Sequence, residues 1–535
     1  MRFRFVLALL WVLIASGVTF GQRGFATPDA VFLNGKVITV DANFTIQQAF
    51  ALQGDRFVAV GTNERVRALA GRSTRVVDLR GRTVIPGLGD NHNHLYDSAR
   101  IMRRGLSLDG VTSTAEALDR IRLGVTAARD GEVVFTTVFR LLGATLSIQE
   151  LDAISTTVPI VVPRDRLSAS LNSAALRRAG VTRESPAFRS VPMPTDGKGN
   201  LTGQTPLPYG ATLALLESIV PAMTDEEEER LLVAAIRERH AVGLTSIRDL
   251  NLYPRAMRAY VRLRRQGLLT LRVSMGLLVP DGIKIEEAVA EWGLGPTFGD
   301  EWLRIDSIGE VPGPIPARSQ VFTNVALTAN RYGWRLSPGV HGGSRALDVA
   351  LDAFEASDRE RTIVGRRWVL EHVPVVTPTQ LDRIARLGVV ASVQYLGHAG
   401  DQSDERDGSM APPVRSLIDR GVIVSAGSDF QNGPASSDNP FIPIYFYVTR
   451  KTSSGQIVDP SQKISRAEAL RVSTYNYAYT TIEEKLKGSI ESGKLADFLI
   501  LSDDVLTVPE EKILSIRPLA TYVGGLQVYG EAKSF

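Results

Sequence analysis

The chain has 535 residues, of which 44% are hydrophobic and 22% are charged. This composition is typical of a folded globular protein, and the length exceeds the roughly 250 to 300 residues of a single core, so we expect one large domain with a satellite, or two domains. Lys and Arg number 61 against 58 Asp and Glu, a formal net charge of +3. No block of basic residues forms a phosphate-binding stripe, which excludes a nucleic-acid partner. The chain has no cysteine, so any metal site must use histidine and carboxylate ligands.

The first 21 residues are typical of an export signal. Arg2 and Arg4 precede the apolar run 5–18, and the small residues Thr19 and Gly21 suit cleavage after Gly21. The alternative is a membrane anchor, but the run is shorter than the roughly 20 residues that span a bilayer. We therefore expect a periplasmic or secreted protein with no stable membrane span after cleavage.

Both ends of the mature chain are rich in predicted strands. Near the N-terminus these are "AVFLNGKVITVD" and "AFALQGDRFVAVG", and near the C-terminus "ADFLILSDD" and "LATYVGGLQVYG". Short apolar runs broken by glycine are typical of a small β unit. We expect residues 28–86 and 487–535 to build one composite β-sandwich domain.

Between these ends, residues 87–486 alternate strand-like runs with helical patterns, which favours a βα barrel. The runs are "EVVFTTVF", "VPIVVP", "GLTSIRD", "LTLRVSMGLL", "EWLRIDSIG", "WRLSPGVH", "RRWVLEH", "GVVASVQY" and "GVIVSAGSD". Thr224 with Glu227, and Ser465 with Glu468, match the capping box that begins a helix. Residues 168–210 are rich in Pro, Gly, Ser and Asn and predict a long insertion over one face.

Polar residues stand where several predicted strands end, and they include four of the six histidines: His92, His94, His341, His372 and Asp429. The carboxyl ends of barrel strands share one rim, where such enzymes keep their active sites. Alternate strand residues point the same way, so His92 and His94 can face one ion. Imidazoles with a carboxylate suit Zn²⁺ or a similar divalent ion.

Each of these residues also has a structural interpretation. The His92 and His94 pair could be a polar loop, His341 a turn histidine, and His372 a residue held by the backbone, while Asp429 could be a turn or N-cap aspartate. His240 lies at a helix C-terminus, where its imidazole would satisfy end carbonyls. His398 lies in "QYLGHAG" and is either a surface residue or a substrate contact.

Five segments in the same order resemble the metal-dependent amidohydrolase superfamily, in its amidohydrolase 3 or YtcJ-like branch. They are "TVIPGLGDNHNHL", "GVHGGSRALDVALDAFE", "RRWVLEHVPVVTPTQLDRIARLGVVASVQ", "GVIVSAGSDF" and "KGSIESGKLADFLIL". The resemblance implies an α/β fold, a distorted TIM (β/α)8 barrel with a composite β-sandwich, that hydrolyses C–N bonds other than peptide bonds. By position, His92 and His94 match the first-strand ligands, His341 and His372 the later histidines, and Asp429 the final-strand aspartate.

Two positions depart from the pattern of this superfamily. Arg304, in "WLRIDSIG", stands where relatives carry a lysine whose carbamate bridges two metal ions, and Leu167 stands where relatives often have a histidine. A guanidinium stays protonated and cannot form the carbamate. We therefore expect one ion rather than two, with Asp306 as a possible neutralising partner of Arg304. Arg304 and His398 are candidate substrate-binding residues.

The expected mechanism places one divalent ion, most simply zinc, on His92, His94, His341 and Asp429, where it lowers the pKa of bound water to about 7. Asp429 would then carry the proton to the leaving nitrogen, while His372 would polarise the carbonyl of a small-molecule substrate or ligate a second ion. Two other hypotheses are a non-catalytic binding protein, favoured by Arg304, and a hydrolase of lactones or other esters.

Overall fold

The computed structural model describes most of the chain. It covers residues 27–530 except 103–104, 109, 138, 140–144, 165–167, 189, 206–208, 280–284, 287–288, 290–292, 311–312, 342, 374–375, 395–411, 430–438 and 453–454. The expected signal 1–21, Leu167 and His398 lie outside the described residues. Among those described, no helix is both long and apolar enough to cross a membrane.

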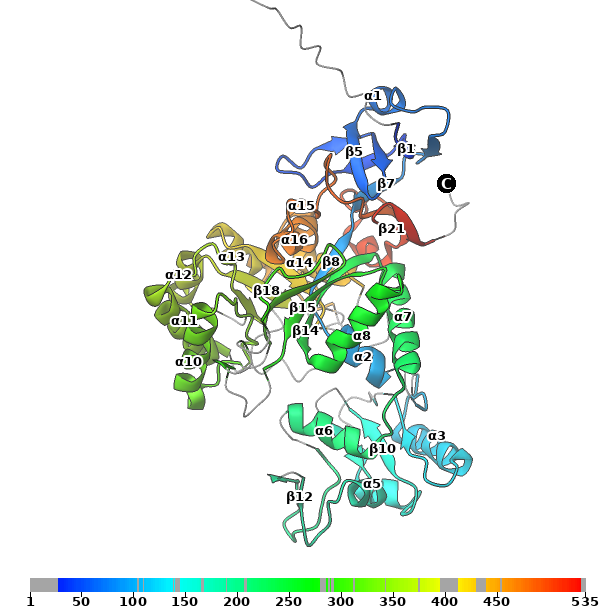
Figure 1. The fold of residues 1–535 in the computed structure, drawn as a ribbon, viewed down its shortest axis with the longest axis vertical. Helices are drawn as coiled ribbons and strands as arrows, with labels where there is room; N and C mark the ends of the chain where they lie inside the picture. The colour runs from blue at the N-terminus through cyan, green and yellow to red at the C-terminus, as the bar shows by residue number, and fades with distance from the viewer. Residues whose placement is uncertain are drawn as a thin grey trace, which may run out of the picture.

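Strands from the two ends of the chain pair within one sheet (Figure 1, top). Its order is β22-β21-β20-β7-β2-β3, with strands β2 Lys36–Ile38, β3 Ile46–Gln47, β7 Thr83–Pro86, β20 Phe498–Leu501, β21 Pro518–Val523 and β22 Leu526–Tyr529. A second sheet, β5-β4-β1-β6, comprises β1 Ala30–Leu33, β4 Ala49–Gln53, β5 Arg56–Gly61 and β6 Arg75–Asp78. Helix α1 Asn63–Arg67 packs beside this second sheet.

An aromatic cluster holds these two sheets together. Phe32 stacks on Phe50 with ring centroids 4.7 Å apart, and Phe498 stacks on Tyr522 at 4.4 Å. Phe32 and Phe498 meet edge to face at 5.3 Å, an arrangement that aromatic rings favour. Residues almost 470 positions apart in the chain therefore share one core.

Parallel strands form the central body of a mixed α/β fold (Figure 1, centre). One sheet has the order β16-β15-β14-β8, with β8 Leu88–Asn93, β14 Leu244–Leu252, β15 Arg272–Leu277 and β16 Leu303–Ile308. Another has the order β17-β18-β19, with β17 Val369–Glu371, β18 Val390–Gln394 and β19 Val424–Gly427. The amide of Asp429 donates to the carbonyl of His92 at 2.8 Å, which places β19 beside β8.

The predicted strand 334–341 forms no strand in the structure. It makes only two isolated parallel bridges, from Leu336 to Ile308 of β16 and from Gly339 to Glu371 of β17. These bridges link the two parallel sheets. The short run contains Pro338, which has no N–H to give to a ladder, and this explains why regular pairing stops there.

Helices cover the central strands, with α10–α12 to the left and α7 and α8 to the right in Figure 1. Their bounds are α2 Leu95–Met102, α7 Asp225–Ala241, α8 Pro254–Arg265, α10 Ser319–Arg331, α11 Gly343–Glu360, α12 Pro378–Leu387, α13 Val414–Asp419, α14 Phe441–Thr449, α15 Arg466–Ser473 and α16 Tyr475–Thr480. The short helices are η1 Pro316–Arg318, η4 Pro460–Gln462 and η5 Glu510–Ser515. Helix α15 begins with the expected capping box of Ser465 and Glu468, and Thr224 caps α7.

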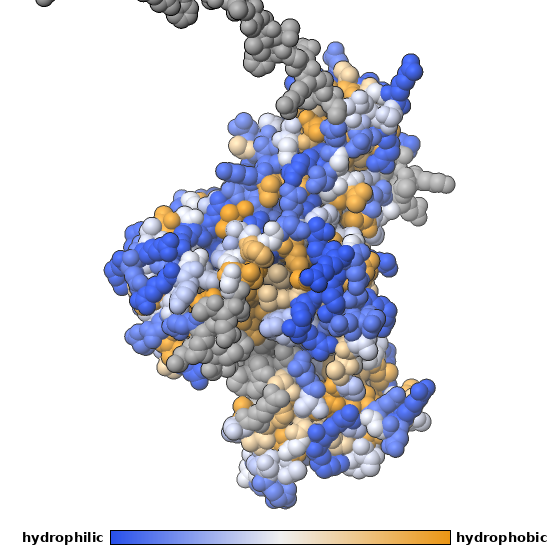
Figure 2. Space-filling view, in the orientation of Figure 1, coloured by the Kyte–Doolittle hydropathy of each residue, from blue (hydrophilic) through white to orange (hydrophobic). Residues whose placement is uncertain are grey.

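A separate lobe occupies the segment between α2 and α7 (Figure 1, bottom). Its three-stranded sheet has the order β11-β10-β9 and joins β9 Val134–Phe135, β10 Ile160–Pro163 and β11 Ala169–Leu171. The lobe also holds β12 Ala187–Phe188, β13 Val191–Pro192, α3 Thr114–Ala127, α4 Ile148–Asp152, α5 Ser173–Arg178 and α6 Tyr209–Ile219. The runs "EVVFTTVF" and "VPIVVP" therefore join this lobe, which is longer than the 168–210 insertion we expected. The face drawn in Figure 2 is largely hydrophilic over α10–α12 and carries more apolar side chains on the lobe.

Candidate metal centre

The histidine pair lies at the carboxyl end of β8. His92 is within the strand, His94 follows it directly, and both side chains are buried. His92 Nδ1 lies 2.7 Å from Glu371 Oε2, and His94 Nδ1 lies 3.3 Å from the Leu250 carbonyl oxygen. Because a carboxylate and a carbonyl can only accept, each Nδ1 carries a proton, and Nε2 is the nitrogen that can bind a metal ion once it has released its own proton.

Asp429, two residues beyond β19, faces both histidines. Its Oδ1 lies 3.4 Å from His92 Nε2 and 3.3 Å from His94 Nε2. One ligand atom from each of these three buried residues lies within 4.8 Å of the others. Two imidazoles and a carboxylate at this spacing can hold one divalent ion.

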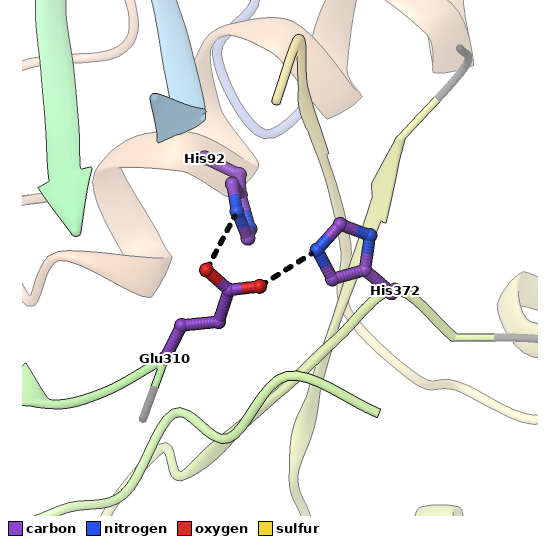
Figure 3. A group of neighbouring side chains, drawn as sticks. All are labelled: His92, Glu310 and His372. Carbon is purple, nitrogen blue, oxygen red and sulfur yellow. Dashed lines mark hydrogen bonds and ion pairs between the residues drawn. The ribbon is translucent and has the colours of Figure 1, made fainter. Parts of the chain in front are cut away.

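Glu310 joins this group to the other two histidines. Its Oε1 lies 2.8 Å from His341 Nε2 and 3.1 Å from His372 Nε2. Its Oε2 faces the first pair, 3.8 Å from His92 Nε2 and 3.6 Å from His94 Nε2. Figure 3 shows the Glu310 carboxylate between the rings of His92 and His372.

The five predicted strand-end residues thus meet around one carboxylate that sequence analysis missed. Four of the five side chains are buried, whereas the side chain of His341 is 62% exposed. Glu310 stands two residues beyond β16, in "SIGEVPG", as His94 and His372 stand just beyond their strands. This position after a buried strand was the available signal.

Arg304 lies at the opposite end of β16 from these ligands. It is the second residue of the strand, its guanidinium pairs with the buried Glu483 at 3.3 Å, and Glu310 is six residues further on, roughly 20 Å of extended chain. Asp306 pairs with Arg248 at 2.6 Å and with Arg335, rather than with Arg304. The structure therefore contradicts our expectation that Arg304 stands at the bridging position, and with it the reason for assigning Arg304 to substrate.

A network of buried charged residues holds His92 in place. Glu371 Oε1 accepts from the guanidinium of Arg248, and Arg248 Nε donates to Asp306 at 2.6 Å. All three residues are buried. Because the charges are paired, this network can hold Glu371 ionised beside His92 despite its burial.

The chain matches the model of a known protein family. The model described as Amidohydrolase family matches residues 75–529, which span both the central strands and the C-terminal strands β20 to β22. The chain belongs to the amidohydrolase family. As a member it is a metal-dependent hydrolase of carbon–nitrogen bonds, in agreement with the resemblance of its motifs.

Two relatives are similar to this chain over most of their length. This amidohydrolase is 28% identical to the N-substituted formamide deformylase of Arthrobacter pascens, over 95% of its own chain and 99% of the relative. It is 25% identical to the putative amidohydrolase YtcJ of Bacillus subtilis, over 89% and 97% of the two chains.

Solved structures share the fold. A metal-dependent hydrolase from Pyrococcus horikoshii matches with a TM-score of 0.70 and 21% identity, over 90% of this chain and 99% of that one. The zinc complex of the atrazine chlorohydrolase TrzN from Arthrobacter aurescens matches with a TM-score of 0.56 and 17% identity, over 94% and 95% of the two chains.

The donor set of this amidohydrolase fits divalent metal ions. Four imidazoles and two carboxylates converge, and the buried Nε2 of His92 makes no hydrogen bond within the described residues. A buried polar atom without a hydrogen bond costs free energy that a metal ion would recover. The residues present therefore suit the metal that the family uses.

The negative charges at the centre favour the binding of a cation. Burial lowers the pKa of His92, but the negative charges of Glu371 and Asp429 outweigh burial and raise it to about 10. Burial raises the pKa of Asp429, but the nearby His372 and His92 outweigh burial and hold this pKa well below its usual value. Asp429 is thus a carboxylate at neutral pH, and the centre attracts positive charge, which a metal ion supplies in place of protons.

His240 lies apart from this centre. Its Nδ1 lies 3.0 Å from the Leu244 carbonyl oxygen, and its Nε2 lies 3.0 Å from Thr270 Oγ1. Burial lowers the pKa of His240 to about 4. It is a neutral structural histidine that joins the end of α7 to the start of β14.

Proposed function

We propose that this amidohydrolase is an exported enzyme that cleaves amide-type, non-peptide C–N bonds of small molecules with zinc. The convergence of His92, His94, Glu310, His341, His372 and Asp429 carries the proposal. Residues 87–486 would form a distorted (β/α)8 barrel, whose carboxyl strand ends supply these ligands. The signal-like segment 1–21 supports export.

Two ions fit the donor set better than one. His92, His94 and Asp429 would hold the first ion, and His341 and His372 the second. Glu310 presents one oxygen to each group and would serve both ions. The expectation of a single ion depended on a missing bridge, and Glu310 supplies a bridging group that needs no carbamate.

A bound divalent ion supplies an activated water near neutral pH and polarises the substrate carbonyl. The carboxylate of Asp429 accepts the proton of the attacking water and passes it to the leaving nitrogen, which lets the amine depart as a neutral molecule. Because Asp429 is buried and ionised, it is a proton acceptor already at neutral pH. We assign His372 to the second ion because its Nε2 faces Glu310.

N-substituted formamides are the first substrates to test, since the similar Arthrobacter pascens enzyme is named for them. A small formyl group suits a centre whose ligands are mostly buried. Lactones form the second class, because the same activated water attacks C–O bonds. Arg304 favoured a non-catalytic binding protein, but its guanidinium pairs with the buried Glu483.

The test is a hydrolysis panel of N-substituted formamides, larger amides and lactones, run on wild type and Asp429→Asn with metal content measured in both. Asn keeps the shape of Asp429 but is a poor base, so amide turnover should fall about 10²- to 10⁴-fold. Lactone hydrolysis alone would replace the proposed substrate class. Metal-loaded protein that turns over nothing in the panel would contradict the proposed function.

A further inference from the structure

Three successive residues at the carboxyl end of β14 form hydrogen bonds with the centre or with the helix that follows its histidine pair. Asp249 Oδ2 accepts from the backbone N–H of Tyr96 at 3.1 Å and from the Tyr260 hydroxyl. The Leu250 carbonyl accepts from His94 Nδ1 at 3.3 Å. Asn251, the third residue, reaches Glu310. One strand end therefore fixes the start of α2, a ligand histidine and the carboxylate between the two histidine groups.

Asn251 holds Glu310 at two points. The backbone N–H of Glu310 donates to Asn251 Oδ1 at 2.9 Å, and Asn251 Nδ2 donates to Glu310 Oε2 at 2.9 Å. Both residues are buried, with 2% of each exposed. A backbone N–H can only donate, so the side-chain oxygen of Asn251 must face it, and this leaves the amide NH₂ for the carboxylate. The amide orientation is therefore determined by its surroundings.

The backbone of Asn251 suits this residue type. Its φ is 59°, in the left-handed region that asparagine tolerates better than most side chains. The Asn251 N–H also donates to the Gly309 carbonyl at 3.1 Å, so side chain and backbone both tie it to the segment 309–310. Among amino acids, a short side chain with both a donor and an acceptor is what this double contact requires.

We propose that Asn251 is a positioning residue that holds the Glu310 carboxylate in the orientation that bridges two metal ions, an inference that rests on the two-ion centre proposed above. The terminal torsion of a glutamate rotates over a broad range. The bond from Asn251 to Oε2 fixes this torsion, so that Oε1 faces His341 and His372 while Oε2 faces His92 and His94. Outer partners of metal ligands contribute about 10- to 100-fold to metal affinity.

The experiment compares wild type with Asn251→Gly and Asn251→Asp in full-length protein. Glycine keeps the left-handed backbone and removes both side-chain bonds, whereas aspartate keeps the acceptor but sets an oxygen against Oε2. Asn34→Gly is the matched control, because Asn34 has a φ of 58° and lies in an exposed turn of the sandwich. Each metal-free protein is titrated with Mn²⁺, bound metal is counted by elemental analysis, and the electron paramagnetic resonance spectrum reports magnetic coupling between bridged ions.

Wild type and Asn34→Gly should bind two ions per chain and show the coupled spectrum. Both Asn251 variants should lose the coupling, and Asn251→Gly should bind its second ion about 10- to 100-fold more weakly. Coupling and affinity unchanged in either folded Asn251 variant would overturn the positioning role while leaving the two-ion centre intact. A wild type that binds only one ion would overturn both. Circular dichroism of the metal-free proteins confirms that each variant is folded, and either Asn251 variant alone suffices for the test.

Discussion

At the scale of single residues, Glu371 links a metal ligand to the buried charges behind it. Its Oε2 lies 2.7 Å from His92 Nδ1, and its Oε1 accepts from Arg248. Glu371→Gln removes the negative charge, so metal affinity should fall about 10- to 100-fold. It also leaves Arg248 partly uncompensated, which should lower the free energy of unfolding by about 3 to 5 kcal/mol. Metal titration and denaturant unfolding of the metal-free protein measure the two effects.

A surface carboxylate serves as the control for this prediction. Glu360 pairs with Arg331 at 2.5 Å, but both side chains are well exposed. Glu360→Gln should change stability by less than about 1 kcal/mol and leave metal affinity unchanged. Equal losses of stability and metal affinity in the Glu371 and Glu360 variants would contradict the role assigned to the buried Glu371 network.

The ligand residues differ in how far the sequence could predict them. His92, His94, His341, His372 and Asp429 were recognisable because they stand at the ends of predicted strands in a chain with six histidines. Glu310 was not, because glutamate is common and only its place after β16 distinguishes it. Arg304 and Glu310 are an even number of residues apart, so strand alternation alone cannot decide which of them reaches the centre. Only the structure shows which end of the strand each occupies.

At the scale of elements, the junction of α7 with β14 and β15 depends on a neutral histidine. Burial lowers the pKa of His240 to about 4, against about 6.5 in an unfolded chain. The unfolded state therefore binds the proton more readily, so the stability that this group contributes is present above pH 6.5 and is lost as the pH falls towards 4. The loss should reach about 2 kcal/mol at pH 5.

Comparison with His240→Gln isolates this effect. Glutamine does not titrate, so the variant should lose less stability than wild type between pH 7.5 and pH 5, even if it is less stable at both. Thermal unfolding of both metal-free proteins at the two pH values measures the difference. An equal loss of stability in both proteins would show that His240 is not the group responsible.

The sequence predicted the type of most elements but not always the sheet they join. The capping residues Thr224 and Ser465 mark real helix starts because a side-chain cap is a local interaction. The strands β9 and β10 resemble central strands in composition, yet they pair with β11 in the lobe. Which strands pair depends on packing between residues that are distant in the chain, and a local sequence pattern carries no information about such packing.

At the scale of the whole molecule, the two chain ends stabilise each other. Phe498 of β20 contacts Phe32, Phe50 and Tyr522, and its side chain is fully buried. Phe498→Ala removes this contact between the ends and should lower the free energy of unfolding by about 3 to 5 kcal/mol. Leu526→Ala is the control, since Leu526 is 68% exposed and should cost less than about 0.5 kcal/mol. Denaturant unfolding monitored by fluorescence compares the two, and similar costs would contradict a shared core.

The most direct test of the central claim is anomalous diffraction at the zinc edge from crystals of the zinc-loaded protein. A two-ion centre should give two peaks per chain, one in contact with His92, His94 and Asp429 and the other with His341 and His372, with Glu310 reaching both. A single peak, or two peaks that Glu310 does not join, would contradict it.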